Sequence, residues 1–331
     1  MEKIFNKDLA NRFVSDYKLP IPITSNKELF FYYLDLFEDE YGTMTKYDTL
    51  LSLINDKFEG NANKFLNEYY NVRENIIQSM LNNPSFINFN EKMDMGQFAV
   101  KDKPNNVSSN NVYNCDNIGK RFISIDLKKA NFQALKSVDP NIVFNASTYE
   151  DFIGLFTDLD YIKDSKYTRQ VIFGKCNPKR HITVEKYLIN EIRKYIETHF
   201  VKQYNLKLVS LSNDEIVYEI NVFDFEKLKS IRLDDIIKNE IFVNLNLNVS
   251  VTVFYLSGYR LLSNGNDKVN KTFFSKQSYY TQKNQLVCVP QPFFPIVFRL
   301  MNCFIPTPND RLIEYEGCIA ELKDEFYIAK L

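Results

Sequence analysis

Several residue types that often build functional sites are scarce in this chain of 331 residues. It has no tryptophan, two histidines, nine glycines and five cysteines. No two cysteines share a CxxC spacing, which argues against the usual zinc and redox motifs. We interpret the cysteines as free thiols and therefore expect a cytoplasmic protein.

Long apolar runs are also missing. No stretch approaches the ~20 apolar residues that cross a bilayer. The first 16 residues alternate charged and apolar side chains and have no signal-peptide core. We therefore expect no membrane contact. The patterns GxxxxGK[ST], GxGxxG, HExxH and GxSxG are absent as well, so that the chemistries tied to them are not indicated.

The composition that remains is that of a globular protein. The chain is 45% hydrophobic and 25% charged, which suits two or three subdomains. Asn and Lys are abundant, as in AT-rich genomes, and this suggests a viral or mobile-element origin. The net charge is −1, which is compatible with nucleic-acid binding if positive charge gathers in one groove.

Apolar periodicity predicts helices in the N-terminal part of the chain and both strands and helices after residue 120. Residues 25–83 read as helices, with Ser25 and Glu28 as a capping box, and residues 101–119 read as a polar loop. Ser147 and Glu150 form a second capping box. The later elements expected are a buried strand over 122–125 ending at Asp126, helices over 165–176 and 183–200, a hairpin of 206–211 and 216–220, and a strand over 248–261.

Three segments carry charge in an informative order. Asp126 ends a buried strand, and Asp214 and Glu215 occupy a hairpin tip. Between them, residues 161–181 hold six basic residues against one acid, Asp164: Lys163, Lys166, Arg169, Lys175, Lys179 and Arg180. Acids from separate strands can meet at one sheet edge, where two Mg²⁺ (or Mn²⁺) ions about 3.5–4 Å apart could support phosphoryl transfer.

This order resembles motifs A, B and C of DNA polymerases over about residues 120–222. Asp214-Glu215-Ile216-Val217-Tyr218-Glu219 is similar to motif C of family A. Arg169-x3-Phe173-Gly174 resembles motif B of that family, and Lys166-x6-Phe173-Gly174 equally resembles motif B of family B. The chain departs from family A at two positions, with Asn213 in place of a histidine and Asn131 in place of the motif A glutamate.

The resemblance implies an α+β fold with a polymerase-like palm. It predicts a helical region over residues 1–95 and a palm over 96–235, with short helical fingers at about 137–178. Residues 236–331 are expected to be β-rich and either to complete the palm or to form a thumb.

The resemblance also implies a function, which is template-directed nucleotidyl transfer in DNA replication. Asp126 and Asp214 would hold two metal ions and Glu215 would support them, while Lys166 and Arg169 would bind the triphosphate. Nucleic-acid contacts are expected from Lys175, Lys179 and Arg180. The expected partners are a primer–template, nucleoside triphosphates and other replication or transcription subunits. Two alternatives stay open: a catalytically inactive polymerase-like subunit for nucleic-acid binding or assembly, and a metal-dependent nuclease.

Overall fold

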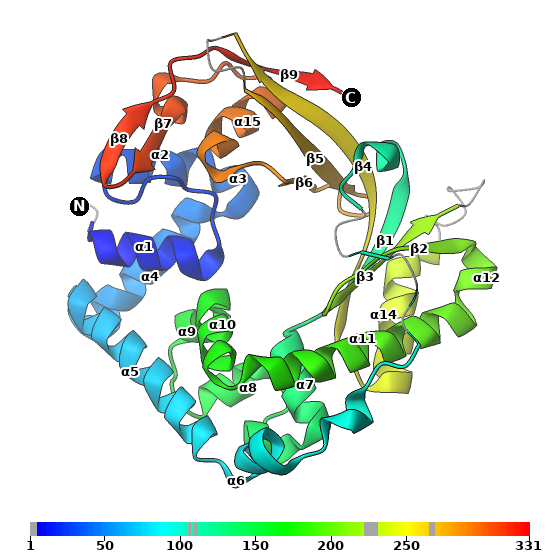
Figure 1. The fold of residues 1–331 in the computed structure, drawn as a ribbon. Coiled ribbons are helices and arrows are strands. Elements are labelled where there is room, and N and C mark those ends of the chain that lie inside the picture. The colour runs from blue at the N-terminus through cyan, green and yellow to red at the C-terminus, as the bar shows by residue number, and fades with distance from the viewer. Residues whose placement is uncertain (1–4, 103, 105–106, 109–111, 222–230, 265–268) are drawn as a thin grey trace.

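The computed structural model describes residues 5–102, 104, 107–108, 112–221, 231–264 and 269–331. It is an α+β structure with a helical N-terminal half and a C-terminal region rich in antiparallel sheet (Figure 1). Among these residues, no helix is both long enough and apolar enough to cross a membrane.

The N-terminal half is built from amphipathic helices. The spacings of four and three between Phe65, Tyr69, Val72, Ile76 and Met80 predict a helical stripe, and this prediction is confirmed, since all five residues are buried on the fifth helix. The capping box is wrong by one residue: the side chain of Asn26, not Ser25, accepts the N–H of Leu29, and asparagine is an equally good N-cap. The helices are α1 (Lys7–Tyr17), α2 (Lys27–Leu36), α3 (Glu38–Tyr41), α4 (Thr43–Phe58), α5 (Ala62–Leu81) and α6 (Pro84–Ile87).

The middle of the chain places one strand before a run of helices and a hairpin after it. Thr148 and Asp151, rather than Ser147 and Glu150, form the capping box. The long helix begins at Pro178, five residues earlier than predicted, because proline is favoured at the first helical position. The elements are β1 (Arg121–Leu127), α7 (Ala130–Val138), α8 (Tyr149–Gly154), α9 (Asp160–Asp164), α10 (Lys166–Lys175), α11 (Pro178–His199), α12 (Val201–Tyr204), β2 (Leu206–Leu211) and β3 (Glu215–Ile220).

The C-terminal region continues the sheet of the middle region. Its elements are α14 (Leu233–Leu245), β4 (Val249–Ser263), β5 (Asn270–Ser278), β6 (Asn284–Val287), α15 (Phe294–Met301), β7 (Leu312–Tyr315), β8 (Cys318–Glu321) and β9 (Phe326–Lys330). The strand order is β2-β3-β1-β4-β5-β6, and β9 also pairs with β4. All pairs along this path are antiparallel, and β7 and β8 form a separate two-stranded sheet.

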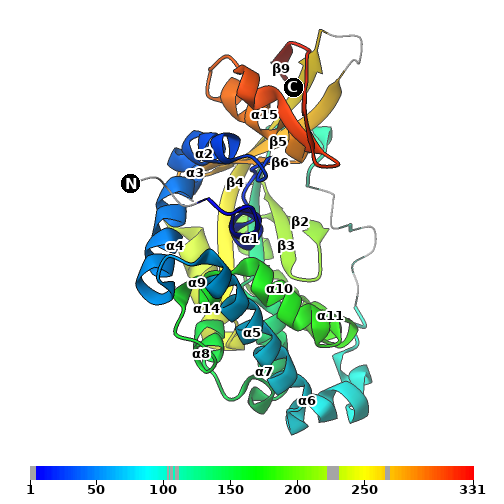
Figure 2. The same cartoon turned by 90° about the vertical axis from the view of Figure 1, so that its left-hand side faces the viewer.

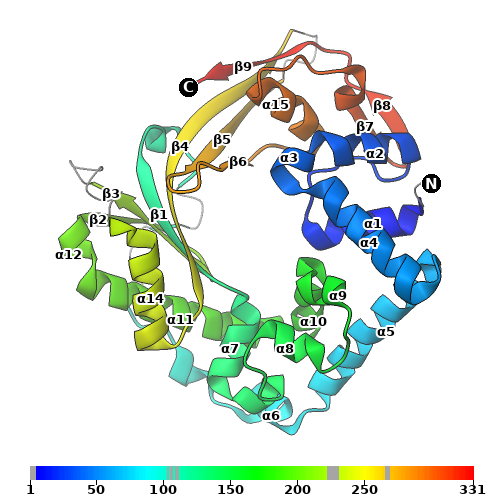
Figure 3. The ribbon, with the colours of Figure 1, turned by 180° about the vertical axis from the view of Figure 1, so that it is seen from behind.

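The two faces of the sheet have different covers. Ile123, Ile125 and Ile216 join the main hydrophobic core on the face that α11 and α14 cover (Figure 3). Alternate residues of a strand point to opposite faces. The other face therefore carries Phe122 and Val217, which pack in a smaller cluster with Phe254, and it also carries Asp126.

The second helix contacts the C-terminal segment. The hydroxyl of Tyr33 on α2 donates to the carbonyl of Asn309 at 2.8 Å. The hydroxyl of Tyr32 donates to the fully buried carboxylate of Asp310 at 2.7 Å, and Arg299 forms an ion pair with the same carboxylate at 3.4 Å. The N-terminal helices thereby close onto the C-terminal segment, as Figure 1 shows.

Candidate active site

Asp126 lies near the end of β1, in the interior of the sheet. It is paired with Glu215 on β3 and with Ser250 on β4. Residues that face each other across antiparallel strands project to the same side of the sheet. The side chains of Asp126 and Glu215 therefore share the face that is opposite α11 and α14.

The turn between β2 and β3 brings Asp214 to the same place. Ser212 Oγ accepts hydrogen bonds from the N–H groups of Asp214 and Glu215, at 3.4 and 2.9 Å, which is the local role of serine in turns. The N–H of Leu127 donates to the carbonyl of Asp214 at 2.8 Å. This bond ties the hairpin tip to the end of β1, so that Asp214 lies beside Asp126.

Two neighbouring carboxylates add negative charge around Asp126. The pKa of Asp126 is raised to about 6, first because the group is buried and then because Asp214 and Glu215 add negative charge. Lys166 and Lys276 oppose this shift. Neighbouring acids disfavour the ionised form of a carboxylate, and a bound cation reverses that effect.

The carboxylates fit divalent ions that arrive with a substrate. Glu215 accepts a hydrogen bond from Ser124 Oγ at 2.5 Å, and Asp214 accepts one from Ser212 Oγ at 3.1 Å. Within the part of the chain that the structure describes, no three or more His, Cys, Asp or Glu side chains form a metal-holding group. Mg²⁺ often binds through one or two carboxylates, with waters and substrate phosphates completing its shell.

The first turn of α10 places two cations near these acids. Lys166 is the first residue of the helix and is exposed, and Arg169 follows one turn later and is half-buried. Both interact electrostatically with Asp126. The structure therefore brings Asp126, Asp214, Glu215, Lys166 and Arg169 together.

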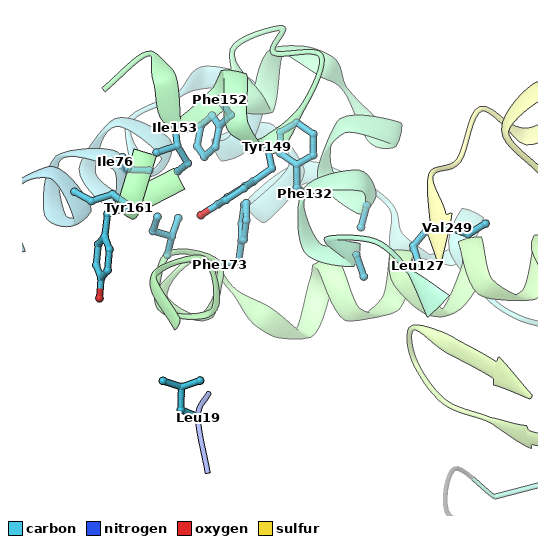
Figure 4. Packing of buried hydrophobic residues seen from close by; sticks show 14 of the residues in the cluster. Leu19, Ile76, Leu127, Phe132, Tyr149, Phe152, Ile153, Tyr161, Phe173 and Val249 are labelled. Atoms are coloured by element: carbon cyan, nitrogen blue, oxygen red, sulfur yellow. The ribbon is translucent and has the colours of Figure 1, made fainter. Parts of the chain in front are cut away.

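Arg169 lies against a buried aromatic cluster. Its guanidinium carbon is 5.7 Å from the centroid of the Tyr149 ring. That ring packs against Phe132, Phe152 and Phe173, with centroids 6.2, 6.4 and 6.3 Å away (Figure 4). Burial lowers the pKa of Arg169, and Nε finds no hydrogen-bond partner among the described residues. A guanidinium that is positioned but unsatisfied is available to an oxyanion.

The three basic residues that were expected to contact nucleic acid are not grouped with Lys166 and Arg169. Lys175 ends α10, roughly 13 Å along the helix axis from Lys166 at 1.5 Å per residue. Lys175 and Lys179 are exposed. Arg180 donates to the carbonyls of Phe89 and Met93 at 2.5 and 3.0 Å. Its guanidinium thus fastens the N-terminal half to α11.

Lys276 on β5 is a site residue that the sequence did not indicate. Its ammonium lies 4.5 Å from the centroid of the Phe254 ring and interacts with Glu215 and Asp126. Burial is the larger influence and lowers the pKa of Lys276. The sequence around Lys276 is that of an ordinary exposed strand and gives no signal of a site. Lys276 comes near the acids only because β5 pairs with β4.

Glu185 on α11 is a second residue that was missed. It is 4% exposed, and Asn131 Nδ2 donates to its Oε1 at 2.7 Å. Burial, with a contribution from Asp214, raises its pKa to about 7. A signal existed, because Glu185 precedes Leu188 by three residues and so lies on the apolar face of the helix.

Comparison of the sequence with protein-family models and with curated proteins finds no match.

Proposed function

We propose that this protein is a polymerase-like nucleotidyltransferase that adds nucleotides from nucleoside triphosphates to a primer along a template. The observation that carries the proposal is the meeting of two strand-end carboxylates, Asp126 and Asp214, with the cations Lys166 and Arg169. Phosphoryl transfer depends on positioning and charge neutralisation more than on covalent chemistry. The sheet around β1 would serve as the palm, and the helices over residues 137–178 as short fingers.

Each side chain has a distinct part in this proposal. Asp126 and Asp214 would hold two Mg²⁺ or Mn²⁺ ions, and Glu215 supports them from its hydrogen bond with Ser124. When bound, the ions would lower the pKa of the primer 3′-hydroxyl and neutralise negative charge on the leaving pyrophosphate. Lys166 and Arg169 grip the triphosphate and align it for in-line attack.

The template and primer need a wider surface than the catalytic cluster. Lys175 and Lys179 are exposed where α10 meets α11, and we assign them to backbone phosphates. Arg180 is the weaker candidate, because its guanidinium is bonded to two backbone carbonyls. We also infer a cytoplasmic setting, where the five free cysteines stay reduced, and an association with other replication or transcription subunits.

A second function is supported by one specific observation. The carboxylate of Glu215 already accepts a hydrogen bond from Ser124 Oγ at 2.5 Å, as it would in a site that holds no metal ion. Such a site could belong to a catalytically inactive polymerase-like subunit that binds nucleic acid or assists assembly.

Primer extension separates these functions. The full chain is incubated with a labelled primer–template, Mg²⁺ and either deoxynucleoside or ribonucleoside triphosphates. We expect extension by the parent and a loss of roughly a thousandfold in Asp126→Asn and Asp214→Asn, since a metal ligand supplies several kcal/mol of transition-state stabilisation. Asp56→Asn, which changes an exposed acid on α4, is the matched control and should extend normally.

The other outcomes are equally informative. Primer binding without extension would favour the inactive subunit. Primer shortening that requires Asp126 would favour a nuclease. Normal extension by either site variant would remove that residue from the metal site.

A further inference from the structure

The end of α1 is fixed to the beginning of α10. Asp16, in the last turn of α1, accepts a hydrogen bond from Ser165 Oγ at 2.7 Å, and Ser165 is the N-cap of α10. The guanidinium of Arg12 lies 3.9 Å from the centroid of the Tyr167 ring. Figure 2 shows α1 end-on, next to α10. These contacts place the residue that follows α1, Lys18, beside the first turn of α10.

Lys18 joins a group of cations whose side chains form no direct ion pair with a described residue. Its pKa is lowered by burial and then by the positive charges of Lys166 and Arg169. None of these three side chains forms an ion pair with any described residue, whereas their neighbour Lys129 pairs with Glu150. Three cations from two elements therefore converge without an ion pair, although Lys166 and Arg169 interact with Asp126 at longer range.

The position of the group suggests which anion it binds. Lys166 and Arg169 also interact with Asp126, so that the cations border the carboxylates of the proposed active site. A chain of phosphates can reach from ions on the carboxylates to several cations beyond them. A single backbone phosphate would occupy fewer of these cations, so that a triphosphate fits the arrangement better than a nucleic-acid backbone does.

We propose that Lys18 is a third cation for the triphosphate, and that α1 of the N-terminal half therefore forms one wall of the nucleotide site. The inference rests on the proposed nucleotidyl transfer and extends it, because it gives the N-terminal half a direct role in binding substrate. The shared ligand chemistry is a phosphate oxyanion, and nucleotide and nucleic acid are the two sources that must be separated.

The backbone at Lys18 offers a clean variant. Lys18 has φ 50° and ψ 48°, in the left-handed region, and its N–H caps the carbonyls of Val14 and Ser15. Glycine is favoured at such a helix end. Lys18→Gly therefore removes the ammonium without straining the backbone, and Lys18→Arg keeps the charge. Lys7→Ala removes an exposed lysine from the other end of the same helix and serves as the control.

The experiment measures binding of inorganic tripolyphosphate, a nucleoside triphosphate and a short oligonucleotide without a triphosphate to the full chain. We expect Lys18→Gly to bind both triphosphates on the order of tenfold more weakly, which is the loss of one charge-assisted contact. Oligonucleotide binding should change less than about twofold, because it does not use this contact. Lys18→Arg and Lys7→Ala should bind as the parent does, and the melting temperature of Lys18→Gly should not fall.

Failure of this inference can be told from failure of the proposed function. If the parent extends primers and Lys18→Gly binds triphosphate normally, only the role of Lys18 is overturned. A loss confined to the oligonucleotide would overturn it as well and assign Lys18 to the nucleic-acid backbone. If the parent neither extends primers nor binds tripolyphosphate, both proposals fail.

Discussion

The surroundings of Asp126 in the folded protein disfavour the ionised form of its carboxyl group. Its reference pKa is about 3.9, and its pKa in the folded protein is raised to about 6 by burial and by Asp214 and Glu215. Between these two values the folded state binds more protons than the unfolded state. The free energy of unfolding therefore falls as pH rises from about 4 to 6, and it stays lower above that range.

A stability comparison tests this charge without any assay of activity. In metal-free buffer, Asp126→Asn should melt close to the parent at pH 4 and above the parent at pH 7.5, because the variant carries no charge to oppose. Added Mg²⁺ should raise the melting temperature of the parent more than that of the variant. If the melting temperatures of Asp126→Asn and the parent differ by the same amount at both pH values, the explanation is contradicted. The control variant Asp56→Asn should melt as the parent does at both pH values.

Lys276 should affect the pH below which primer extension loses activity. It lowers the pKa of Asp126 and so helps to keep that carboxylate ionised. Lys276→Met should therefore shift the acid limb of primer extension to higher pH, and Lys276→Arg should restore it. Lys271→Met removes an exposed lysine from the same strand and should leave the profile in place.

The site residues differed in how far the sequence could reveal them. Asp126 and Asp214 were found because each lies beside a strand with a clear apolar pattern, and Ser165 was found as a helix start. Lys276 and Lys18 had no such signal. Lys18 reaches the site through the contact of α1 with α10, and Lys276 reaches it because β5 pairs with β4 and β4 pairs with β1. Local periodicity does not encode the contacts of α1 with α10 or of β4 with β1, which join elements more than 100 residues apart.

At the scale of elements, α10 is held in place by one buried acid. Asp16 is 1% exposed. It accepts hydrogen bonds from Tyr69, Tyr161 and Ser165 at 2.8, 2.9 and 2.7 Å, and it pairs with Arg12 at 3.2 Å. These partners come from α1, α5, α9 and the cap of α10, so that a single carboxylate sets the position of the basic helix.

Asp16→Ala should lower the free energy of unfolding by roughly 3–5 kcal/mol, the cost of leaving a buried ion partner unpaired. Urea unfolding followed by circular dichroism measures the loss. Asp8→Ala, at the exposed start of the same helix, should cost less than about 1 kcal/mol through the helix dipole. Equal losses in the two variants would show that Asp16 does not join the elements as described.

The helices themselves were largely predictable, but their starts were less so. Apolar spacing located α5, α10 and most of α11, because each buries one continuous stripe. The starts of α2 and α8 were each misplaced by one residue, because neighbouring polar residues can cap a helix equally well. α1 lies within the helical region that was predicted over residues 1–95, but apolar spacing did not give its bounds, because its buried face includes the charged residues Arg12 and Asp16.

At the scale of the whole molecule, one sheet crosses the boundary that the sequence suggested near residue 235. β1 lies between β3 and β4, and Phe122 stacks on Phe254 with centroids 5.5 Å apart. The α+β class and a β-rich C-terminal region could be read from the sequence. Which strands pair, and which C-terminal residues α2 contacts, could not be predicted, because such pairs have no local signature.

Removal of residues 236–331 should therefore prevent cooperative folding. β1 would become an unpaired edge and would lose the partner of Phe122. We expect a chain ending at residue 235 to lack a cooperative urea transition, and the amide of Asp126 to exchange freely. A sharp transition in that chain would show that the first 235 residues form an independent unit.

The order of the strands also has a consequence for synthesis. Leu127 leaves the ribosome 149 residues before Lys276, which is roughly 7–30 s at about 5–20 residues per second. The N-terminal helices can pack during that interval. β1 has not yet paired with β4, and the face that carries Phe122 remains exposed. A nascent chain that pauses there exposes this face to aggregation or to a chaperone, and its carboxylates assemble before Lys276, one of the two cations that lower the pKa of Asp126, has been synthesised.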